Sequence, residues 1–335
     1  MGRHVNIPIF IPHLGCPNQC VFCNQRFISG VSEFDPDSVR CDIDEALSTV
    51  ESDAEAEIAF FGGSFTGIDR DLMVSLLRIA SEYVDQGRVS SIRCSTRPDY
   101  IDAEILDILK IYKVNVIELG IQSVDESVLK ITKRGHAVED TMRAVRLIKE
   151  YGFTLVGQMM IGLPGSSLES EIETAEFIAE CGAEYARIYP TIVFKDTELY
   201  GMTLSGLYQP LSTNDAVIRS ARVFEVFHNA GVKVIRIGLC ASENLESDKT
   251  YYRGPNHPAL GELILSEFYF KKESDLLENH LENKSPIVLV SRGHLSRAIG
   301  QKRINKTRLI SEFGLASIEF REDDEVSPFE LKLLI

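Results

Sequence analysis

Three cysteines near the start of the chain have the types and spacing needed to bind iron. Cys16, Cys20 and Cys23 stand in the segment HLGCPNQCVFCNQ with the spacing C-x3-C-x2-C. Three thiolates can hold three irons of a 4Fe–4S cluster and leave the fourth iron without a protein ligand. Such an open iron can bind a small molecule. A zinc site with His13 as its fourth ligand is the alternative, because closely spaced cysteines also occur in zinc and redox sites.

The remaining cysteines and the composition indicate a reducing compartment. The chain has 335 residues and 7 cysteines, and the cysteines outside the motif are widely spaced: Cys41, Cys94, Cys181 and Cys240. This pattern disfavours a disulfide framework and predicts a cytoplasmic protein whose other thiols are free and mostly buried. We find no run of about 18 apolar residues and no signal peptide, so we expect no membrane contact.

The chain is acidic overall, but its charge is unevenly distributed. The net charge is −15, which disfavours general nucleic-acid binding. The window from Lys284 to Ser311, however, contains no Asp or Glu. Its cations are Lys284, Arg292, Arg297, Lys302, Arg303, Lys306 and Arg308. This window is either a solvated basic face or a segment that binds nucleic acid.

Short β-branched segments alternate with helical ones along most of the chain. Strands are predicted at 5–11, 57–63, 90–96, 114–123, 153–165, 184–190 and 232–239, and helices at 35–50, 69–84, 103–112, 139–152, 168–182 and 214–230. Strict alternation implies a parallel sheet covered by helices. Six or seven such units predict an α/β fold, a partial (β/α)6-type barrel. A doubly wound sheet would show the same alternation, and the cysteine loop after the first strand favours the barrel.

Residues with binding chemistry follow the predicted strands, where the active sites of barrels lie. Gly62 and Gly63 would let the backbone approach a ligand closely. Gln122 could bind ribose hydroxyls, and the planar fork of Arg134 suits a carboxylate. Further polar residues at such ends are Arg97, Gln158 and Tyr189. Each residue alone has an ordinary structural explanation, and their combination in this order predicts a cofactor site.

The cysteine motif and the segments STRPDY, IELGIQSVDESVLKITKRGHAVEDTMRAV and MMIGLPG resemble the radical SAM superfamily. Over roughly residues 5–245 the chain resembles the radical SAM domain of the Elongator catalytic subunit family. The resemblance implies that the three cysteines hold a 4Fe–4S cluster, whose open iron binds S-adenosylmethionine (SAM). It also implies an electron donor, such as flavodoxin or ferredoxin, for reductive cleavage of SAM to a 5′-deoxyadenosyl radical. The implied cofactor-binding residues are Phe22, Gly62, Gly63, Ser95, Arg97, Gln122, Arg134 and Gln158.

The same resemblance implies a substrate. In the Elongator family the radical acts on acetyl-CoA to build carboxymethyl groups on the wobble uridine of tRNA, so we expect an enzyme that modifies RNA. The alternative is a small molecule or a protein, as in the oxygen-independent coproporphyrinogen oxidases, which share part of the pattern. Two departures stand out: we expect no acetyltransferase-like domain and hence no use of acetyl-CoA, and Ser95 stands where related proteins carry an acid.

The last part of the chain predicts a small α/β domain. A Gly-, Pro- and polar-rich linker at 246–260 would separate a barrel domain at 1–245 from this domain at 261–335. Two predicted helices, 295–299 and 304–314, flank the segment IGQKRIN and resemble part of a type-II KH domain. KH loops of the form G-x-x-G clamp a nucleic-acid backbone. The predicted RNA-binding residues are Gly300, Lys302, Arg303, Lys306 and Arg308. Arg303 replaces the second glycine and one KH strand is not evident, so a structural cap is the alternative.

Overall fold

The chain forms two compact units. The computed structural model describes residues 4–11, 14–16, 20–25, 34–51, 54–239, 250–278, 280 and 284–334. One unit comprises Met1–Leu211 with Val226–Gly254, and the other comprises Ser212–Glu225 with Pro255–Ile335. The predicted domain limits and the linker at 246–260 stay a prediction, because residues 240–249 lie outside the described part.

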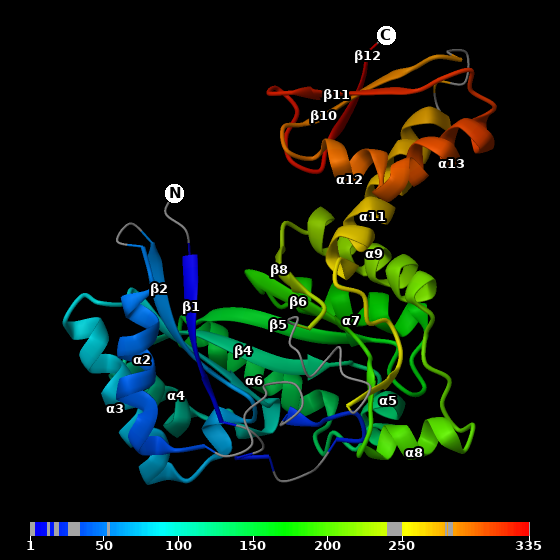
Figure 1. The fold of residues 1–335 in the computed structure, drawn as a ribbon. Helices are drawn as coiled ribbons and strands as arrows, with labels where there is room; N and C mark the ends of the chain where they lie inside the picture. Colours follow the sequence, from blue (N-terminus) through cyan, green and yellow to red (C-terminus); the bar gives the residue numbers. More distant parts are fainter. Residues whose placement is uncertain are drawn as a thin grey trace. The chain divides into compact units, whose positions relative to one another are not determined.

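Seven parallel strands form one curled sheet in the first unit, which confirms the predicted partial barrel. The strands lie side by side in chain order (Figure 1). They are β1 (His4–Phe10), β2 (Glu55–Phe61), β3 (Ser91–Thr96), β4 (Val114–Gln122), β5 (Thr154–Ile161), β6 (Tyr185–Pro190) and β8 (Lys233–Ile237). All carboxyl ends therefore meet at one edge, where the loops that carry the cysteines and other polar residues begin.

Helices connect these strands. They are α2 (Val39–Ser48), α3 (Arg70–Asp85), α4 (Ala103–Ile111), α5 (Glu126–Ile131), α6 (Val138–Glu150), α7 (Leu168–Glu180), α8 (Glu198–Leu204) and α9 (Thr213–Asn229). Side-chain caps mark several starts: Asp69 accepts a hydrogen bond from the amide of Leu72, and Asp102 accepts one from Ile105. The short α5 and α8, and a two-stranded sheet of β7 (Val193–Phe194) and β9 (Tyr251–Arg253), were not predicted. None of the described helices is long and apolar enough to cross a membrane.

The two faces of the seven-stranded sheet differ in polarity. On β4, Ile117 and Leu119 are fully buried, while the alternating Glu118 and Gly120 line a cavity. Successive side chains of a strand point to opposite faces, so the sequence itself separates an apolar outer face from a polar inner face. The helices pack on the strands from the apolar side, as the contacts of α4 with β4 and of α6 with β5 show. The polar inner face is therefore left for the site.

Besides the part of α9 up to Glu225, the described residues of the second unit form three strands and three α-helices. Its elements are α11 (Leu260–Glu278), β10 (Ile287–Ser291), α12 (Leu295–Ile299), α13 (Ile304–Phe313), β11 (Glu319–Asp323) and β12 (Leu331–Leu334). Strand β10 lies between β11, to which it is parallel, and β12, to which it is antiparallel (Figure 1). The sequence did not predict the four-residue β12, which is too short to show a clear alternation. The likeness to a KH domain stays a prediction.

One buried acid in the second unit has no partner. Glu273 on α11 is 0% exposed, and neither carboxylate oxygen has a hydrogen-bond partner among the described residues. Burial raises the pKa of this carboxyl well above its ordinary value, an effect that Arg308 opposes. A buried polar group without a hydrogen bond costs free energy whether it is charged or neutral.

We expect Glu273→Met to raise the free energy of unfolding at neutral pH by about 1–3 kcal/mol, the usual cost of an unsatisfied buried group. The folded-state pKa lies above the unfolded one, so the wild type loses stability as pH rises from the unfolded pKa. The gain should therefore be larger at pH 8 than at pH 5. Urea unfolding at both pH values measures it.

The matched control is Glu278→Met, which changes an exposed acid on the same helix. We expect it to alter the free energy of unfolding by no more than about 0.5 kcal/mol. An equal gain from Glu273→Met at both pH values would show that the carboxyl does not titrate abnormally.

Candidate active site

A cavity of about 1190 Å³ lies on the inner face of the seven-stranded sheet. Each of the seven strands contributes at least one lining residue. The residues predicted to bind the cluster or the cofactor all line it: Cys16, Cys20, Phe22, Cys23, Gly62, Gly63, Ser95, Arg97, Gln122, Arg134 and Gln158. The fold thus brings together residues that are far apart in the sequence, while their individual roles stay a prediction.

The three cysteines of the motif follow β1 and are sheltered from solvent. Cys20 is buried, and Cys16 and Cys23 are partly buried. The Cys23 amide donates to the Cys20 carbonyl over 3.0 Å, which closes a tight turn. Burial, followed by the effects of Cys20 and Cys16, raises the pKa of the Cys23 thiol to about 12. The Cys23 thiol therefore needs nearby positive charge to ionise, which a metal centre provides.

The alternative of a single zinc ion stays a prediction. Among the residues that the structure describes, no group of three His, Cys, Asp or Glu side chains is placed to hold one metal ion. The fourth ligand proposed for zinc, His13, lies outside the described residues. Cysteines that hold separate irons of a cluster do not have to converge on one point.

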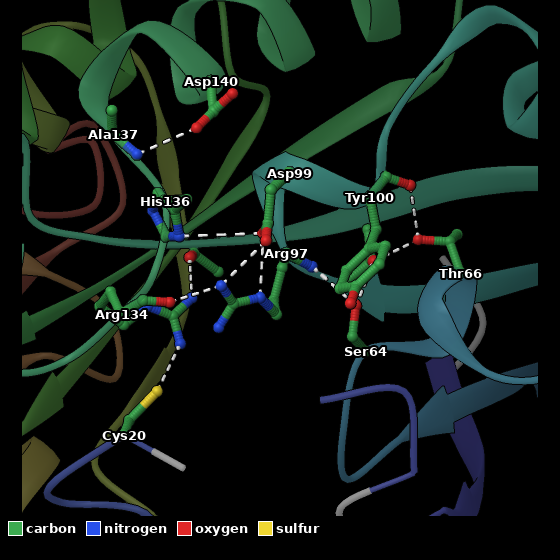
Figure 2. Close-up of polar contacts among 12 residues, drawn as sticks. Cys20, Ser64, Thr66, Arg97, Asp99, Tyr100, Arg134, His136, Ala137 and Asp140 are labelled. Carbon is green, nitrogen blue, oxygen red and sulfur yellow. Dashed lines mark hydrogen bonds and ion pairs between the residues drawn. The ribbon is translucent and has the colours of Figure 1, made fainter. Parts of the chain in front are cut away.

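Arg134 contacts a cysteine of the motif. Its Nη1 donates to Cys20 Sγ over 3.3 Å, and its Nη2 donates to the Gly120 carbonyl over 2.6 Å. Arg97 Nη2 donates to the Arg134 carbonyl, and Asp99 holds the Arg97 guanidinium through two bonds of 2.9 and 3.0 Å. Figure 2 shows this connection from Asp99 to Cys20. The sequence indicated a carboxylate-binding Arg134 and gave no sign of its contact with the thiol.

Buried donors beside the cysteines lack partners. Arg134 Nε and Arg97 Nη1 have no hydrogen-bond acceptor among the described residues. Buried polar groups are normally paired, so these two cationic donors fit an anionic group next to the thiols. Gly62 has a φ of +102°, and a Cβ there would lie 3.1 Å from the backbone nitrogen of Ile11. The residues present therefore fit a thiolate-bound 4Fe–4S cluster together with the carboxylate of SAM.

Other predicted residues of the cavity have contacts of their own. Gln158 Nε2 lies 3.4 Å from Gln122 Oε1, so the two amides face each other across neighbouring strands. Gln122 has a φ of +68°, a left-handed conformation at the end of β4. Ser95 donates a hydrogen bond to Glu118 over 3.2 Å. The Ser95 hydroxyl on β3 is therefore hydrogen-bonded to a side chain of the neighbouring strand β4.

A row of charged side chains crosses the inner face of the sheet. This charged row consists of Glu57 on β2, Arg93 on β3, Glu118 on β4 and Arg187 on β6. Arg93 bridges the two acids, with Nε 2.6 Å from Glu57 Oε2 and Nη1 2.7 Å from Glu118 Oε1. Arg187 Nη2 also lies 2.7 Å from Glu118 Oε1. The glutamate side chains are 1% exposed, so these are buried ion pairs in which each charge depends on its neighbours.

The sequence analysis missed the charged row, although the strands carry a signal for it. In EIAFF, SIRCS and VIELG a charged residue occupies a position among apolar neighbours, which is unusual for a buried parallel strand.

The cysteines outside the motif lie away from the cavity where the structure describes them, and Cys94 on β3 faces the opposite side of the sheet from the charged row. It alternates with the lining residues Arg93 and Ser95, does not line the cavity, and is fully buried. Cys41 is exposed and Cys181 partly buried, while Cys240 lies outside the described residues.

The predicted RNA-binding residues lie in the second unit, around the turn between α12 and α13. Gly300 has a φ of +77°, and Lys302 and Arg303 also have left-handed values of +53° and +64°. Arg303 thus keeps a backbone conformation that glycine favours. Lys302 and Arg303 are exposed and Lys306 is partly buried. Arg308 differs from them, because its guanidinium lies 2.5 Å from Glu267 and 3.4 Å from the centre of the Phe270 ring.

We expect Arg93→Met to lower the free energy of unfolding by about 3–5 kcal/mol. The change leaves Glu57 buried without its arginine and removes one of the two arginines of Glu118, and breaking a buried pair costs about this much. Urea unfolding measures the loss. The matched control is Arg70→Met, which removes a surface pair with Glu104 and should cost at most about 1 kcal/mol. Equal losses in the two variants would contradict the burial of the charged row.

Comparison with protein families gives two matches. The radical SAM superfamily matches residues 10–178, and the radical SAM C-terminal domain matches residues 183–269. The first match covers the cysteine motif and strands β2 to β5 of the sheet.

Among curated proteins, the chain is similar to a tRNA uridine(34) acetyltransferase, to Elongator complex protein 3 and to an uncharacterized protein. The tRNA uridine(34) acetyltransferase of Methanocaldococcus infernus is 39% identical over 126 residues, which is 36% of this chain and 23% of that protein. Elongator complex protein 3 of Homo sapiens is 37% identical over 135 residues, 39% of this chain and 25% of that protein. An uncharacterized protein of Methanocaldococcus jannaschii is 32% identical over 164 residues, 48% of this chain and 50% of that protein. The matches thus span between about a quarter and a half of these relatives.

Two solved structures share the fold. The archaeal Methanocaldococcus infernus Elp3 with an N-terminal deletion has a TM-score of 0.63 at 21% identity, over 82% of this chain and 68% of that chain. Methylornithine synthase has a TM-score of 0.52 at 17% identity, over 74% of this chain and 77% of that chain. At these identities the likeness shows the fold alone.

Proposed function

We propose that this chain, which belongs to the radical SAM superfamily, uses a 4Fe–4S cluster and SAM to modify RNA. The proposed modification is of the tRNA uridine class. Membership of the superfamily makes the chain an enzyme and implies both cofactors. The RNA substrate is the proposed part. The observation that carries it is the similarity of more than a third of this chain, 36% and 39%, to proteins named for tRNA uridine and for Elongator.

The geometry supports a division of roles within the cavity. Cys16, Cys20 and Cys23 would hold the cluster, which when bound supplies the electron for reductive cleavage of SAM to a 5′-deoxyadenosyl radical. Arg134 would stabilise the Cys20 thiolate through its Nη1 and could offer its unpaired Nε to the SAM carboxylate. An electron donor such as flavodoxin or ferredoxin would deliver the electron.

Further predicted SAM-binding residues surround these groups. A backbone carbonyl at Gly62 or Gly63 would accept a hydrogen bond from the SAM amino group, Gln122 would bind the ribose hydroxyls, and Gln158 would line the SAM site. Phe22, Ser95 and Arg97 complete the predicted set, and all line the same cavity. Arg97 would offer its unpaired Nη1, while Asp99 and the Arg134 carbonyl hold the rest of its guanidinium.

The second unit offers a place for an RNA backbone. A left-handed and a right-handed residue in succession turn backbone amides toward one side and form a concavity that suits a phosphate. The left-handed Arg303 and the right-handed Ile304 form such a pair, and Lys302 and Arg303 are exposed. Gly300 fits the turn because a Cβ there would lie 2.9 Å from Ile304 and 3.0 Å from Asn305. We propose that Lys302, Arg303 and Lys306 contact phosphates, and that the ion-paired Arg308 mainly fixes α13.

Anaerobically purified protein should bind about four irons per chain, and changing Cys16, Cys20 or Cys23 to Ala should remove the cluster. Iron analysis and the absorbance near 400 nm measure this. With dithionite and SAM, the wild type should form 5′-deoxyadenosine, which chromatography detects. The matched control is Cys41→Ala, an exposed cysteine outside the motif. Iron retained in the triple variant, or stoichiometric zinc in the wild type, would refute the cluster.

Replacing Lys302, Arg303 and Lys306 with Gln should weaken tRNA binding and flatten its salt dependence. Each lost phosphate contact lowers the slope of log K against log salt by roughly 0.7–0.9, so three contacts give about 2. Gel-shift titrations at several salt concentrations measure both effects.

The matched control removes three cations from the strand side of the same unit: Arg292, Arg321 and Lys332. It changes the net charge by the same amount and should leave the salt slope nearly unchanged. Wild-type binding by the first variant would make the second unit a structural cap. Comparison of modified nucleosides in tRNA from cells with and without the gene would then decide whether RNA is the substrate.

A further inference from the structure

Arg236 lies at the β8 end of the charged row and forms no ion pair with a described carboxylate. Arg187 pairs in register with Arg236 on β8, so two arginines occupy neighbouring strands. Glu118, the acid that serves Arg187, already contacts Arg93 as well. Arg236 Nε donates to the Gly238 carbonyl over 3.1 Å, and no carboxylate in the described part of the chain forms an ion pair with Arg236. The alternation of acids and bases across the sheet therefore stops at an arginine.

The charges around the cavity favour an anionic ligand. Its lining carries more cations than carboxylates: Arg93, Arg97, Arg134, Arg187, Lys233 and Arg236 against Glu55, Glu57 and Glu118. This excess stands out in a chain whose net charge is −15. Arg97 is held by Asp99, and Arg93 and Arg187 by the charged row, whereas Lys233 and Arg236 on β8 form no ion pair with a described residue. The excess positive charge is therefore concentrated on β8, where it would attract a negative group.

Tyr189 adds a neutral donor beside these arginines. Arg187 Nη1 donates to Tyr189 Oη over 3.2 Å, so the phenol oxygen is already an acceptor. The Tyr189 hydroxyl has no acceptor among the described residues, and it lines the cavity. Burial raises the pKa of Tyr189, an effect that Arg187 opposes, so the phenol keeps its proton and can donate it. Tyr189 therefore offers one O–H and Arg236 two Nη groups to the same space.

We propose that Arg236 and Tyr189, supported by Arg187, bind an oxyanion of the substrate, a phosphate or a carboxylate, inside the cavity. The planar guanidinium matches two oxygens of such a group, and the phenol donates a further hydrogen bond. The inference rests on the proposed function, because it assigns part of the same cavity to the substrate.

The register of the sheet places this oxyanion site next to the predicted cofactor site. Arg187 pairs with Gln158, and Tyr189 pairs with Met160, so β6 adjoins the strand that carries a predicted SAM-binding residue. Strand β8 is the last strand of the sheet, one position further from β5. A substrate held at β8 by its anionic end would extend toward β5 and the cofactor. Arg236 would then act by positioning the substrate.

Calorimetric titration of the anaerobic, cluster-loaded and SAM-bound protein tests the site. The probes are uridine 5′-monophosphate, uridine and succinate, which separate a nucleotide phosphate from a small-molecule carboxylate. We expect Arg236→Gln to weaken binding of the anionic probe by on the order of 10-fold to 100-fold, the effect of a lost charged hydrogen bond. Uridine should bind to the wild type and to Arg236→Gln with the same affinity. The affinity of Arg236→Lys for the anionic probe should lie between those of the wild type and Arg236→Gln, because lysine keeps the charge but loses the planar fork.

The matched control is Arg146→Gln, which removes the same charge from the exposed surface of α6 and should bind all probes like the wild type. Loss of affinity for uridine 5′-monophosphate alone assigns the site to a nucleotide phosphate, and loss for succinate alone assigns it to a carboxylate. Wild-type affinity in Arg236→Gln, or binding of neither anion to the wild type, overturns the proposal. If Arg236→Gln fails to hold iron, unchanged affinity in both Arg236→Lys and Tyr189→Phe overturns it.

This test is independent of the proposed chemistry. Calorimetry requires no turnover, so a wild type that forms no 5′-deoxyadenosine would refute the proposed function and leave the oxyanion site standing. Conversely, SAM cleavage by a wild type that binds neither anion would refute only the oxyanion site.

Discussion

A charge can be buried in a protein only if another charge or a hydrogen bond compensates it, and this constraint shapes the inner face of the sheet. Glu57, Arg93 and Glu118 are almost fully buried and hold each other through contacts of 2.6 and 2.7 Å. The positions of three strands are thereby coupled to one another through side chains as well as through backbone hydrogen bonds. An apolar inner face would have filled with side chains, as in a closed barrel, whereas a polar one remains open to a ligand.

The same constraint operates beside the cysteine loop. Asp99 holds Arg97, Arg97 holds the backbone of Arg134, and Arg134 reaches Cys20. Arg97 and Asp99 follow β3, Arg134 follows β4, and Cys20 follows β1, so three segments of the chain are linked at the carboxyl edge of the sheet. The two arginine nitrogens that remain unpaired, Arg134 Nε and Arg97 Nη1, mark the place where this compensation is incomplete without a cofactor. Arg236 on β8 is a second cation of the cavity whose charge no described carboxylate compensates. The cavity thus shows two positions for negative groups, one at the thiols and one at the far strand.

The second unit follows a different principle. Its acids and bases pair on the surface of the helices, as Arg297 does with Glu262 and Arg308 with Glu267. These pairs reduce the basic window of the sequence to fewer available cations, which cluster at the left-handed turn before α13. A sequence count of Lys and Arg therefore overstates the positive surface, because folding brings acids from α11 against some of them.

The sequence by itself determined the cluster motif, the β-α order and the strand-end residues, because these depend on local spacing and on the rule that parallel strands end at one edge. It therefore predicted the partial barrel and placed all of its candidate cofactor residues at what proved to be one cavity. Only the tertiary structure decided what those side chains contact. The charged row, the bond from Arg134 to Cys20 and the register of Arg187 with Arg236 join residues from different strands and loops. Such contacts depend on register, twist and side-chain reach, which one strand's sequence does not contain.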